Sequence, residues 1–440
     1  MSYRRSPSLV VIAAGVPSLL LLLLHPAQLW SGVLVVIAAV GACAVGWRAE
    51  QESGQGRGLP RATWPVVAVL AAVAVAKSPI GSHDLWSYAF YGRVVSVHHA
   101  DPYTAVASSY PHDLVYHLVG WHHVPTAYGP LFTGYSALVA RVAGNSVLAL
   151  RLGFQLPAAL AVLACLALLV RRGRTSTALV VALQPFVWLS VVNGGHNDAW
   201  LALGLLVAVI LWRERRYLPA GLAVGLVTLV KLSGIIAVVP VVAVLVARRR
   251  WRAAMSFSAG SVGVFVIGAL WAPKSLTNAS KGTRTLTSIA SVWHPIRAVF
   301  HLSGSMITLV SLLLVMALVA WWTWMHRDDR DVSFITGAAT SAFPLASSYS
   351  LPWYSVWGLP ALALSGDVVA TSLVASRGSL ILAANSIGTR PADLLFGGVL
   401  TIVVPIALLV AFHLHVTFTR PAASNGQRPR SSSVGTSTTR

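Results

Sequence analysis

Charged residues are scarce in this sequence. Only 10% of the 440 residues are Asp, Glu, Lys or Arg, and 56% are hydrophobic, whereas about a quarter of a typical soluble domain is charged. This balance excludes an ordinary soluble enzyme. Apolar runs such as SLVVIAAGVPSLLLLLL approach bilayer length, and in lipid the backbone must satisfy its own hydrogen bonds. We therefore expect an all-α, polytopic membrane protein.

Cysteines and acidic residues are the rarest reactive groups. The two cysteines, Cys43 and Cys165, both lie inside apolar runs, which favours small core residues over a disulfide or a metal site. Basic residues outnumber acidic ones by 32 to 12, for a net charge of +20. The basic residues cluster in short loops between apolar runs, so they indicate orientation in a membrane rather than a nucleic-acid partner.

The apolar runs predict about 13 transmembrane helices. Basic loops mark the cytoplasmic side, and all of them fall on one side only if the apolar stretch 128–144 lies along the membrane surface. This places the N-terminus inside, the C-terminus outside and a large first outer loop, with an interfacial helix, at about 80–146. The expected spans are residues 8–24, 30–47, 64–80, 147–170, 177–193, 199–212, 217–231, 233–247, 253–272, 304–325, 332–349, 354–375 and 394–417.

The spans and loops suggest four parts of the chain. Residues 1–63 would form two transmembrane helices and a cytoplasmic loop, and residues 64–375 a transmembrane catalytic core. Residues 376–417 would hold the last transmembrane helix. The tail, 418–440, is rich in Ser, Thr, Gly and Pro and is expected to be disordered. Within the core, the segment 218–247 should form a hairpin of two short apolar halves around KLSG.

Two acidic residues stand out among the twelve. Asp84 and Asp198 each lie where an expected span meets the outer face. Carboxylates at membrane depth are costly, so they are usually paired or functional. Both residues could instead cap helices, and for Asp198, in NGGHND, that alternative stays open. For Asp84 a function is favoured, because four aromatic residues follow it closely: Trp86, Tyr88, Phe90 and Tyr91.

Several short motifs, in order, resemble a known enzyme family. They are GRVVSVHHADPY, YGPLFTGYSALVARVAG, NGGHNDAW and LPWYSVW, with Asp84 before them and a lysine in the broken hairpin. This order resembles polyprenyl-phosphate-sugar-dependent glycosyltransferases of the GT-C fold. It is most similar to the α-mannosyltransferases that extend lipomannan in mycolate-type bacterial envelopes. The resemblance covers roughly residues 64–360.

The resemblance implies both an activity and a location. It implies transfer of mannose from a polyprenyl-phosphate donor to a glycan or glycolipid acceptor, on the extracytoplasmic face of the cytoplasmic membrane, with membrane lipids as partners. In the family's pattern the loop aspartate, here Asp84, is the catalytic base. Many GT-C enzymes carry a second, adjacent acid that sometimes holds a metal. Here His83 precedes Asp84 instead, so neither a metal nor another cofactor is expected.

The residues themselves are compatible with this chemistry. A lipid phosphate is a good leaving group, so one carboxylate that deprotonates the acceptor can suffice for displacement with inversion. The phosphate needs cations. Lys231, in the hairpin, is the first choice, with Arg93 and Arg297 as further candidates, although basic side chains at a membrane often only reach toward headgroups.

The remaining candidates are polar or aromatic residues near the expected outer face. Aromatic rings there often form the interfacial belt, but flat rings also stack on sugars. Seven histidines in the first outer loop suggest zinc, yet their spacing matches no standard metal pattern. The expected substrate-binding residues are His83, Tyr88, Asp101, Tyr103, Tyr128, His196, Asn197, Asp198, His294 and Trp353.

Other functions remain open at this point. An arabinosyl or other polyprenyl-phosphate-sugar transferase would need the same residues. A secondary transporter or lipid-carrier flippase would also use broken helices and charges at the membrane edge. A transporter should show an internal repeat, and none is found; its first outer loop would also not be expected to carry the rare acids.

Overall fold

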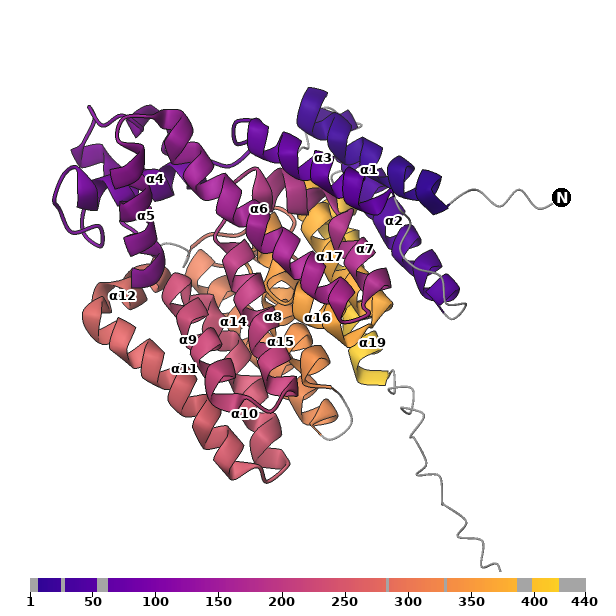
Figure 1. The fold of residues 1–440 in the computed structure, drawn as a ribbon. Coiled ribbons are helices and arrows are strands. Elements are labelled where there is room, and N and C mark those ends of the chain that lie inside the picture. The colour runs from indigo at the N-terminus through magenta and orange to yellow at the C-terminus, as the bar shows by residue number, and fades with distance from the viewer. Residues whose placement is uncertain are drawn as a thin grey trace, which may run out of the picture.

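The structure is a computed structural model that describes residues 7–24, 28–53, 62–281, 285–327, 331–385 and 398–418. Within these ranges the chain is helical and contains no strand (Figure 1), as the composition predicted. The tail from residue 419 onward lies outside the described residues, and the prediction of disorder there stays a prediction. So does the division of the chain into four parts.

The first half of the chain alternates long helices with short, broken ones. Pro17 and Pro157 lie inside two of the long helices. The elements are α1 (Pro7–Leu24), α2 (Gln28–Ser53), α3 (Thr63–Ala76), α4 (Asp84–Ser96), η1 (Ala107–Ser109), η2 (Tyr116–Leu118), α5 (Pro130–Ala143), α6 (Val147–Arg171), α7 (Thr175–Ala182), η3 (Val187–Val192), α8 (Asp198–Arg213) and α9 (Tyr217–Val230).

The second half continues in the same way. The hairpin expected at 218–247 is present, with a 3-10 segment between its two helices. The elements are η4 (Leu232–Ala237), α10 (Val238–Ala247), α11 (Trp251–Trp271), α12 (Pro273–Lys281), α13 (Trp293–Phe300), α14 (Gly304–His326), α15 (Val332–Ala346), η5 (Pro352–Val356), α16 (Leu359–Ser365), α17 (Val368–Ala384), η6 (Val399–Val403) and α19 (Val404–Phe418).

Several helices have the length and composition of membrane spans. Among the described residues, five are long and apolar enough to cross a bilayer: Trp30–Glu52, Val147–Arg171, Trp251–Trp271, Gly304–His326 and Val399–Phe418. Six further apolar helices are shorter. These helices indicate a membrane protein, and the count of about 13 spans stays a prediction.

Two of the expected spans are wrong as continuous helices. The segment 354–375 is interrupted at Gly366, which has a φ of 85°, and Asp367 caps the next helix by accepting a hydrogen bond from the Ala370 amide. The second half of that segment therefore belongs to α17, which runs on to Ala384. The segment 177–193 is likewise divided into α7 and the π-helix η3, with a turn before Pro185, because proline favours a helix start over a helix interior.

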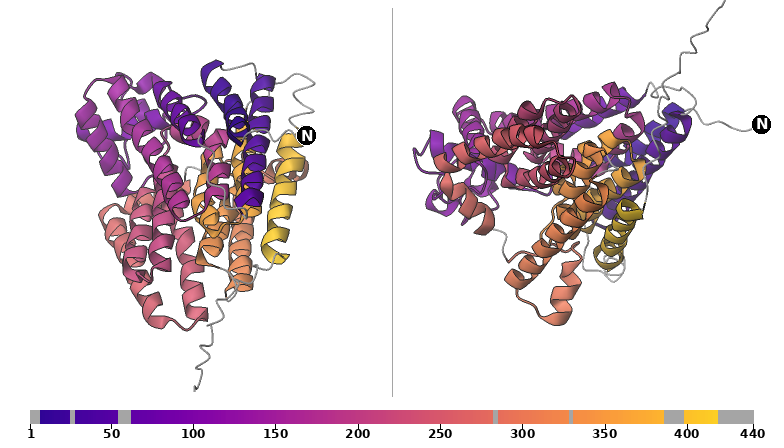
Figure 2. Two further views of the ribbon diagram at one scale, coloured as in Figure 1. Left: turned by 45° about the vertical axis from the view of Figure 1, so that its right-hand side comes forward. Right: turned by 90° about the horizontal axis from the view of Figure 1, so that it is seen from below.

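The first outer loop contains the helices α4 and α5 and forms one end of the molecule. Figures 1 and 2 show α4 and α5 together at this end, while α1 to α3 lie beside the C-terminal helices. The helix at 130–143 falls within the stretch expected to be interfacial. A buried network stabilises the loop: Arg93 donates to both carboxylate oxygens of Asp113, at 3.1 and 3.0 Å, and His98 lies 2.7 Å from the same carboxylate.

A second polar network fixes the segment that leads into α4. The side-chain amide of Asn193 donates to carbonyl oxygens at the end of α3 and just beyond it, and its oxygen accepts from the Ile80 amide at 2.7 Å. Gln155 donates to the Lys77 and Asn193 carbonyls. Because buried polar groups must be paired, these bonds bring the residues before Asp84 next to the turn that follows η3.

Packing of α4 on α5 depends on Gly92. A Cβ at this position would lie 2.0 Å from the Ser136 carbonyl oxygen, so the two backbones approach more closely than any side chain permits.

We expect Gly92→Ala to lower the free energy of unfolding by about 1–3 kcal/mol through overpacking. Thermal unfolding in detergent micelles measures this loss. The matched control is Gly134→Ala on α5, where a Cβ meets no atom within 4 Å; an equal loss in both variants would contradict the packing argument.

Candidate active site

Asp84 is the first residue of α4, and its carboxylate lies between two other segments. One oxygen, Oδ1, accepts a hydrogen bond from the indole N–H of Trp121 at 2.9 Å. The other, Oδ2, is 3.5 Å from Nε2 of His196. The side chain keeps 16% of its surface exposed. The carboxylate is therefore held by a loop residue and by the turn before α8, and it remains accessible.

The His196 ring is fully buried and its orientation is fixed. Nδ1 lies 2.8 Å from the Ser190 carbonyl oxygen, and since a carbonyl only accepts, Nδ1 carries a hydrogen. Nε2 faces the Asp84 carboxylate and the Ser82 hydroxyl, which is 3.4 Å away. The Trp353 ring stacks on the His196 ring, with the two ring centroids 3.7 Å apart and an interplanar angle of 22°. Nε2 of His196 is therefore held toward the Asp84 carboxylate by the Ser190 carbonyl on one side of the ring and the stacked indole on its face.

The environment of Asp84 favours its ionised form. Burial by itself raises the pKa of the carboxyl group. The hydrogen bond and charge of His196, the Trp121 N–H and the charge of Lys231 act in the opposite direction and outweigh it. The net pKa of Asp84 lies below its ordinary value, so the carboxylate is available as a base at neutral pH.

A second charged pair lies in the same region. Asp198 is fully buried at the start of α8, and its Oδ1 accepts hydrogen bonds from Lys231 Nζ, at 2.7 Å, and from the indole of Trp357. Lys231 follows the last residue of α9, where the chain turns into η4. Its ammonium lies 4.5 Å from the ring centroid of Tyr354, 5.2 Å from that of Trp357 and 6.0 Å from that of Tyr128. The ammonium is thus held by one carboxylate inside an aromatic cage.

Two tyrosines connect the two pairs. The hydroxyl of Tyr128 donates to that of Tyr88 at 3.4 Å, and their rings meet edge to face at 5.0 Å. Tyr88 also faces His196, with ring centroids 6.3 Å apart, while Tyr128 faces Lys231. Asp84 and Lys231 therefore belong to one continuous cluster of charged and aromatic side chains.

Asn197 is next to this cluster in sequence and carries unpaired polar atoms. It lies between His196 and Asp198 in sequence and is buried, and neither its amide nitrogen nor its amide oxygen has a hydrogen-bond partner in the structure. The second carboxylate oxygen of Asp198 is also buried without a partner. Buried polar atoms are rarely left unpaired, and these two neighbouring side chains together carry three such atoms.

Comparison with known proteins assigns the chain to a family. Residues 9–248 match the model of the MptA_B family, described as alpha-(1->6)-mannopyranosyltransferase, N-terminal domain. This match spans more than half of the chain. The chain belongs to this mannosyltransferase family. Searches of curated proteins and of solved structures found no match. The family assignment makes the protein a glycosyltransferase, as its motifs had suggested.

The matched region contains the charged residues of the cluster. Asp84, His196, Asp198 and Lys231 all lie within residues 9–248. The aromatic residues from LPWYSVW lie beyond that region. Side chains from both parts of this mannosyltransferase-family chain therefore meet at the candidate site.

Other expected site residues lie in different surroundings. Arg93 is bound to Asp113 and donates to the Gly144 carbonyl at 3.0 Å. Arg297, on α13, donates to the Thr285 carbonyl and the Thr287 hydroxyl. His294 also lies on α13. Within the described ranges, no side-chain hydrogen bond joins these three residues to Asp84 or Lys231, and their proposed roles stay predictions.

The remaining expected residues lie on the first outer loop. His83 is next to Asp84 but turns its Nδ1 to the Leu118 carbonyl, at 2.8 Å. Asp101 forms a 2.9 Å ion pair with Lys274 on α12. The Tyr103 hydroxyl donates to that of Thr133 on α5, at 3.4 Å. These contacts tie the loop to α5 and α12.

Sequence reasoning did not identify three residues as parts of the site. Trp121 was not among the expected site residues, although it donates to Asp84. Tyr354 and Trp357 were not singled out, although both contact Lys231. The signal was the motif LPWYSVW, in which the spacing of Trp353, Tyr354 and Trp357 places three aromatic rings on one short turn.

No metal centre is evident in the described part of the chain. There, no three His, Cys, Asp or Glu side chains gather in a way that would hold a metal ion. The expectation that no metal is needed stays a prediction.

The Asp198–Lys231 pair provides a test of the site's architecture. Lys231→Met would leave the buried Asp198 carboxylate uncompensated, and we expect the free energy of unfolding to fall by about 3–5 kcal/mol. The double variant Asp198→Asn/Lys231→Met removes both charges and should recover most of this loss. The midpoint of thermal unfolding in detergent micelles measures both effects. Equal losses in the single and double variants would show that the charge pair does not control stability here.

Proposed function

We propose that this protein transfers mannose from a polyprenyl-phosphate donor to a hydroxyl group of a glycan or glycolipid, on the extracytoplasmic side of the cytoplasmic membrane. One observation carries the proposal. A carboxylate kept ionised, Asp84, and a caged ammonium, Lys231, lie in one cluster joined by Tyr88 and Tyr128. A base and a phosphate-binding cation are the two groups that the reaction needs. The family match favours mannose over arabinose and a transferase over a transporter.

In this proposal Asp84 acts as the general base. Its carboxylate takes the proton of the acceptor hydroxyl, and the acceptor oxygen attacks the anomeric carbon of mannose. The bond from that carbon to the phosphate oxygen breaks, and the polyprenyl phosphate leaves with the bonding electrons. A single displacement inverts the anomeric centre. An α-linked product, which the family name describes, therefore requires a β-linked donor.

Lys231 stabilises the phosphate as negative charge develops on it. The Lys231 side chain keeps 16% of its surface exposed, and the surrounding rings lower the local polarity, which strengthens its attraction for an anion. Asp198 holds the ammonium in place. The proposal gives the cation's role to Lys231 and includes no metal. The unpaired amide of Asn197 provides a donor and an acceptor for hydroxyl groups of the sugar.

Replacing the base tests the mechanism directly. We expect Asp84→Asn to reduce mannosyl transfer from polyprenyl-phosphate mannose by about two to four orders of magnitude, because an amide cannot accept the acceptor's proton. Radiolabelled mannose incorporated into a short mannoside acceptor measures the rate.

The matched control for this change is Glu214→Gln. Glu214 pairs with Arg172 on an exposed surface, 2.6 Å apart, so the same chemical change there should leave the rate and the thermal midpoint unaltered. Full activity in a correctly folded Asp84→Asn variant would remove Asp84 from the mechanism.

The hydrogen bond from Trp121 should control the pH dependence. This N–H is among the groups that lower the pKa of Asp84, so Trp121→Phe should raise that pKa. A base works only when ionised, and the acid limb of kcat/KM should therefore move to higher pH, while activity on the alkaline side of that limb stays unchanged. A pH–rate profile of the variant measures this. A uniform loss at every pH, with no movement of the limb, would mean that Trp121 acts through substrate binding instead.

A further inference from the structure

A basic pocket lies at the end of the molecule away from the candidate site. Figure 1 shows the turn between α10 and α11 at this end, far from α4 and α5. The pocket has a volume of about 610 Å³ and lies between Tyr217, the first residue of α9, and the start of α11. Its lining includes Arg249, Arg250, Trp251 and Arg252. Because basic loops mark the cytoplasmic side of a membrane protein, we expect this pocket to face the cytoplasmic leaflet.

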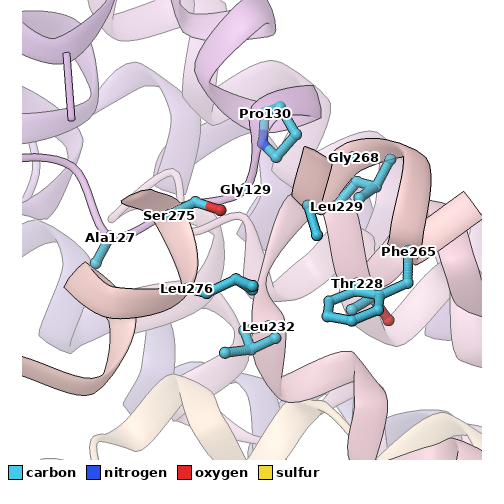
Figure 3. A pocket seen from close by; sticks show the side chains of 11 residues that line it. Ala127, Gly129, Pro130, Thr228, Leu229, Leu232, Phe265, Gly268, Ser275 and Leu276 are labelled. Carbon is cyan, nitrogen blue, oxygen red and sulfur yellow. The ribbon is translucent and has the colours of Figure 1, made fainter. Parts of the chain in front are cut away.

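The space between α9 and α11 differs between their two ends. Along their length the helices are in close contact, since a Cβ at Gly221 of α9 would lie 2.1 Å from the Phe257 carbonyl oxygen of α11. Figure 3 shows the pocket at their far ends, where Leu229 and Phe265 belong to a largely apolar lining; its volume is about 10 Å³. The space is therefore nearly filled at that end, whereas the basic pocket at the starts of the helices has room for a ligand.

The arginines of the basic pocket are not neutralised by carboxylates. In the part of the chain that the structure describes, no ion pair involves Arg249, Arg250 or Arg252. Glu214, the acidic residue nearest to them in the sequence, is paired with Arg172 at 2.6 Å. Positive charges around one hollow repel one another, so an anion would stabilise them. Phosphate is an anion that arginine binds with two parallel hydrogen bonds.

The basic pocket also adjoins an apolar surface. Trp251 lines the pocket and is 56% exposed, and Met255, one helical turn further on, is 64% exposed. The exposed positions continue with Ala259, Val262 and Val266, and their spacing of three or four residues places them in one stripe along α11. This helix is one of the five that could cross a membrane. An apolar chain lying on the stripe would therefore begin at the pocket.

We propose that the basic pocket binds the phosphate headgroup of an anionic phospholipid of the adjoining leaflet, with one acyl chain along the exposed stripe of α11. This site goes beyond the proposed function and does not depend on it. Basic pockets between transmembrane helices are suited to such headgroups. A soluble phosphate would match the arginines and leave the stripe uncovered, while a zwitterionic lipid would bring its own cation among the arginines. An anionic lipid matches both parts.

Arg249 offers a way to remove one charge without disturbing the fold. Its φ is 54°, in the left-handed region that favours glycine, and the turn is closed by the Arg250 amide, which donates to the Leu245 carbonyl at 2.8 Å. Arg249→Gly should therefore keep this turn. Arg215, in the turn after α8, has a φ of 62° and does not line the pocket. Arg215→Gly is the matched control, because it removes the same charge from the same backbone conformation.

The experiment measures lipid binding to the full-length protein in detergent micelles by native mass spectrometry. With phosphatidylglycerol, Arg249→Gly should raise the Kd about tenfold, the effect of losing one charge-assisted hydrogen bond. Arg252→Gln removes a second charge of the pocket without touching the turn and should weaken binding in the same way. Arg215→Gly should bind as the wild type does. Phosphatidylcholine should bind weakly to all four proteins, and glycerol 1-phosphate, which has no acyl chain, should not displace phosphatidylglycerol.

A labelling experiment tests the position of the acyl chain. A phosphatidylglycerol with a diazirine on one acyl chain should label peptides from 251–266 in the wild type and in Arg215→Gly, and less in Arg249→Gly. Equal losses of affinity in Arg249→Gly and Arg215→Gly would show that net charge attracts the lipid, and would overturn the proposal. Unchanged affinity in both pocket variants, or displacement of the lipid by glycerol 1-phosphate, would overturn it as well. None of these measurements involves mannosyl transfer, so they decide what the pocket binds even if the proposed function fails.

Discussion

The ion pair between Asp198 and Lys231 is the interaction on which the site depends. A carboxylate with no exposed surface is stable only if a cation neutralises it, and Lys231 does so at 2.7 Å. The pair ties the start of α8 to the point where α9 breaks into η4. The same ammonium lies on the rings of Tyr354, Trp357 and Tyr128, so three separate parts of the chain are fixed around one charge. The position of this cation is therefore fixed from several sides.

Asp84 is placed by a different set of contacts. The amide network of Asn193 and Gln155 binds the end of α3 to the turn after η3, and this turn carries His196. The close approach of α4 and α5 at Gly92 then fixes the orientation of α4, the helix that begins at Asp84. Because the helix begins at Asp84, the partial positive charge of its N-terminus also favours the ionised form. Asp84 and Lys231 thus reach one cluster through separate parts of the fold.

The outer segment contacts both the candidate site and α12. Trp121, which lies between α4 and α5, donates to Asp84, and one face of α5 lines an apolar groove beside α12. The ion pair of Asp101 with Lys274 and the hydrogen bonds of Asn278 to the Tyr103 and Thr126 carbonyls hold α12 against this segment. A rearrangement of α12 would therefore alter both the groove and the loop that positions Asp84.

Sequence alone determined the helical class, the membrane character, the broken hairpin and the family, because these follow from local composition and short motifs. It also singled out Asp84 and Lys231, since charges are rare in so apolar a chain. It failed where helices break inside apolar runs, as at Gly366 and Pro185, because hydropathy does not report helix continuity. Only the tertiary structure decided that Arg93 is bound to Asp113, that Trp121 donates to Asp84, and that Trp357 and Tyr354 enclose Lys231. These partners are separated from each other by tens to hundreds of residues, and their contacts arise only when distant helices pack.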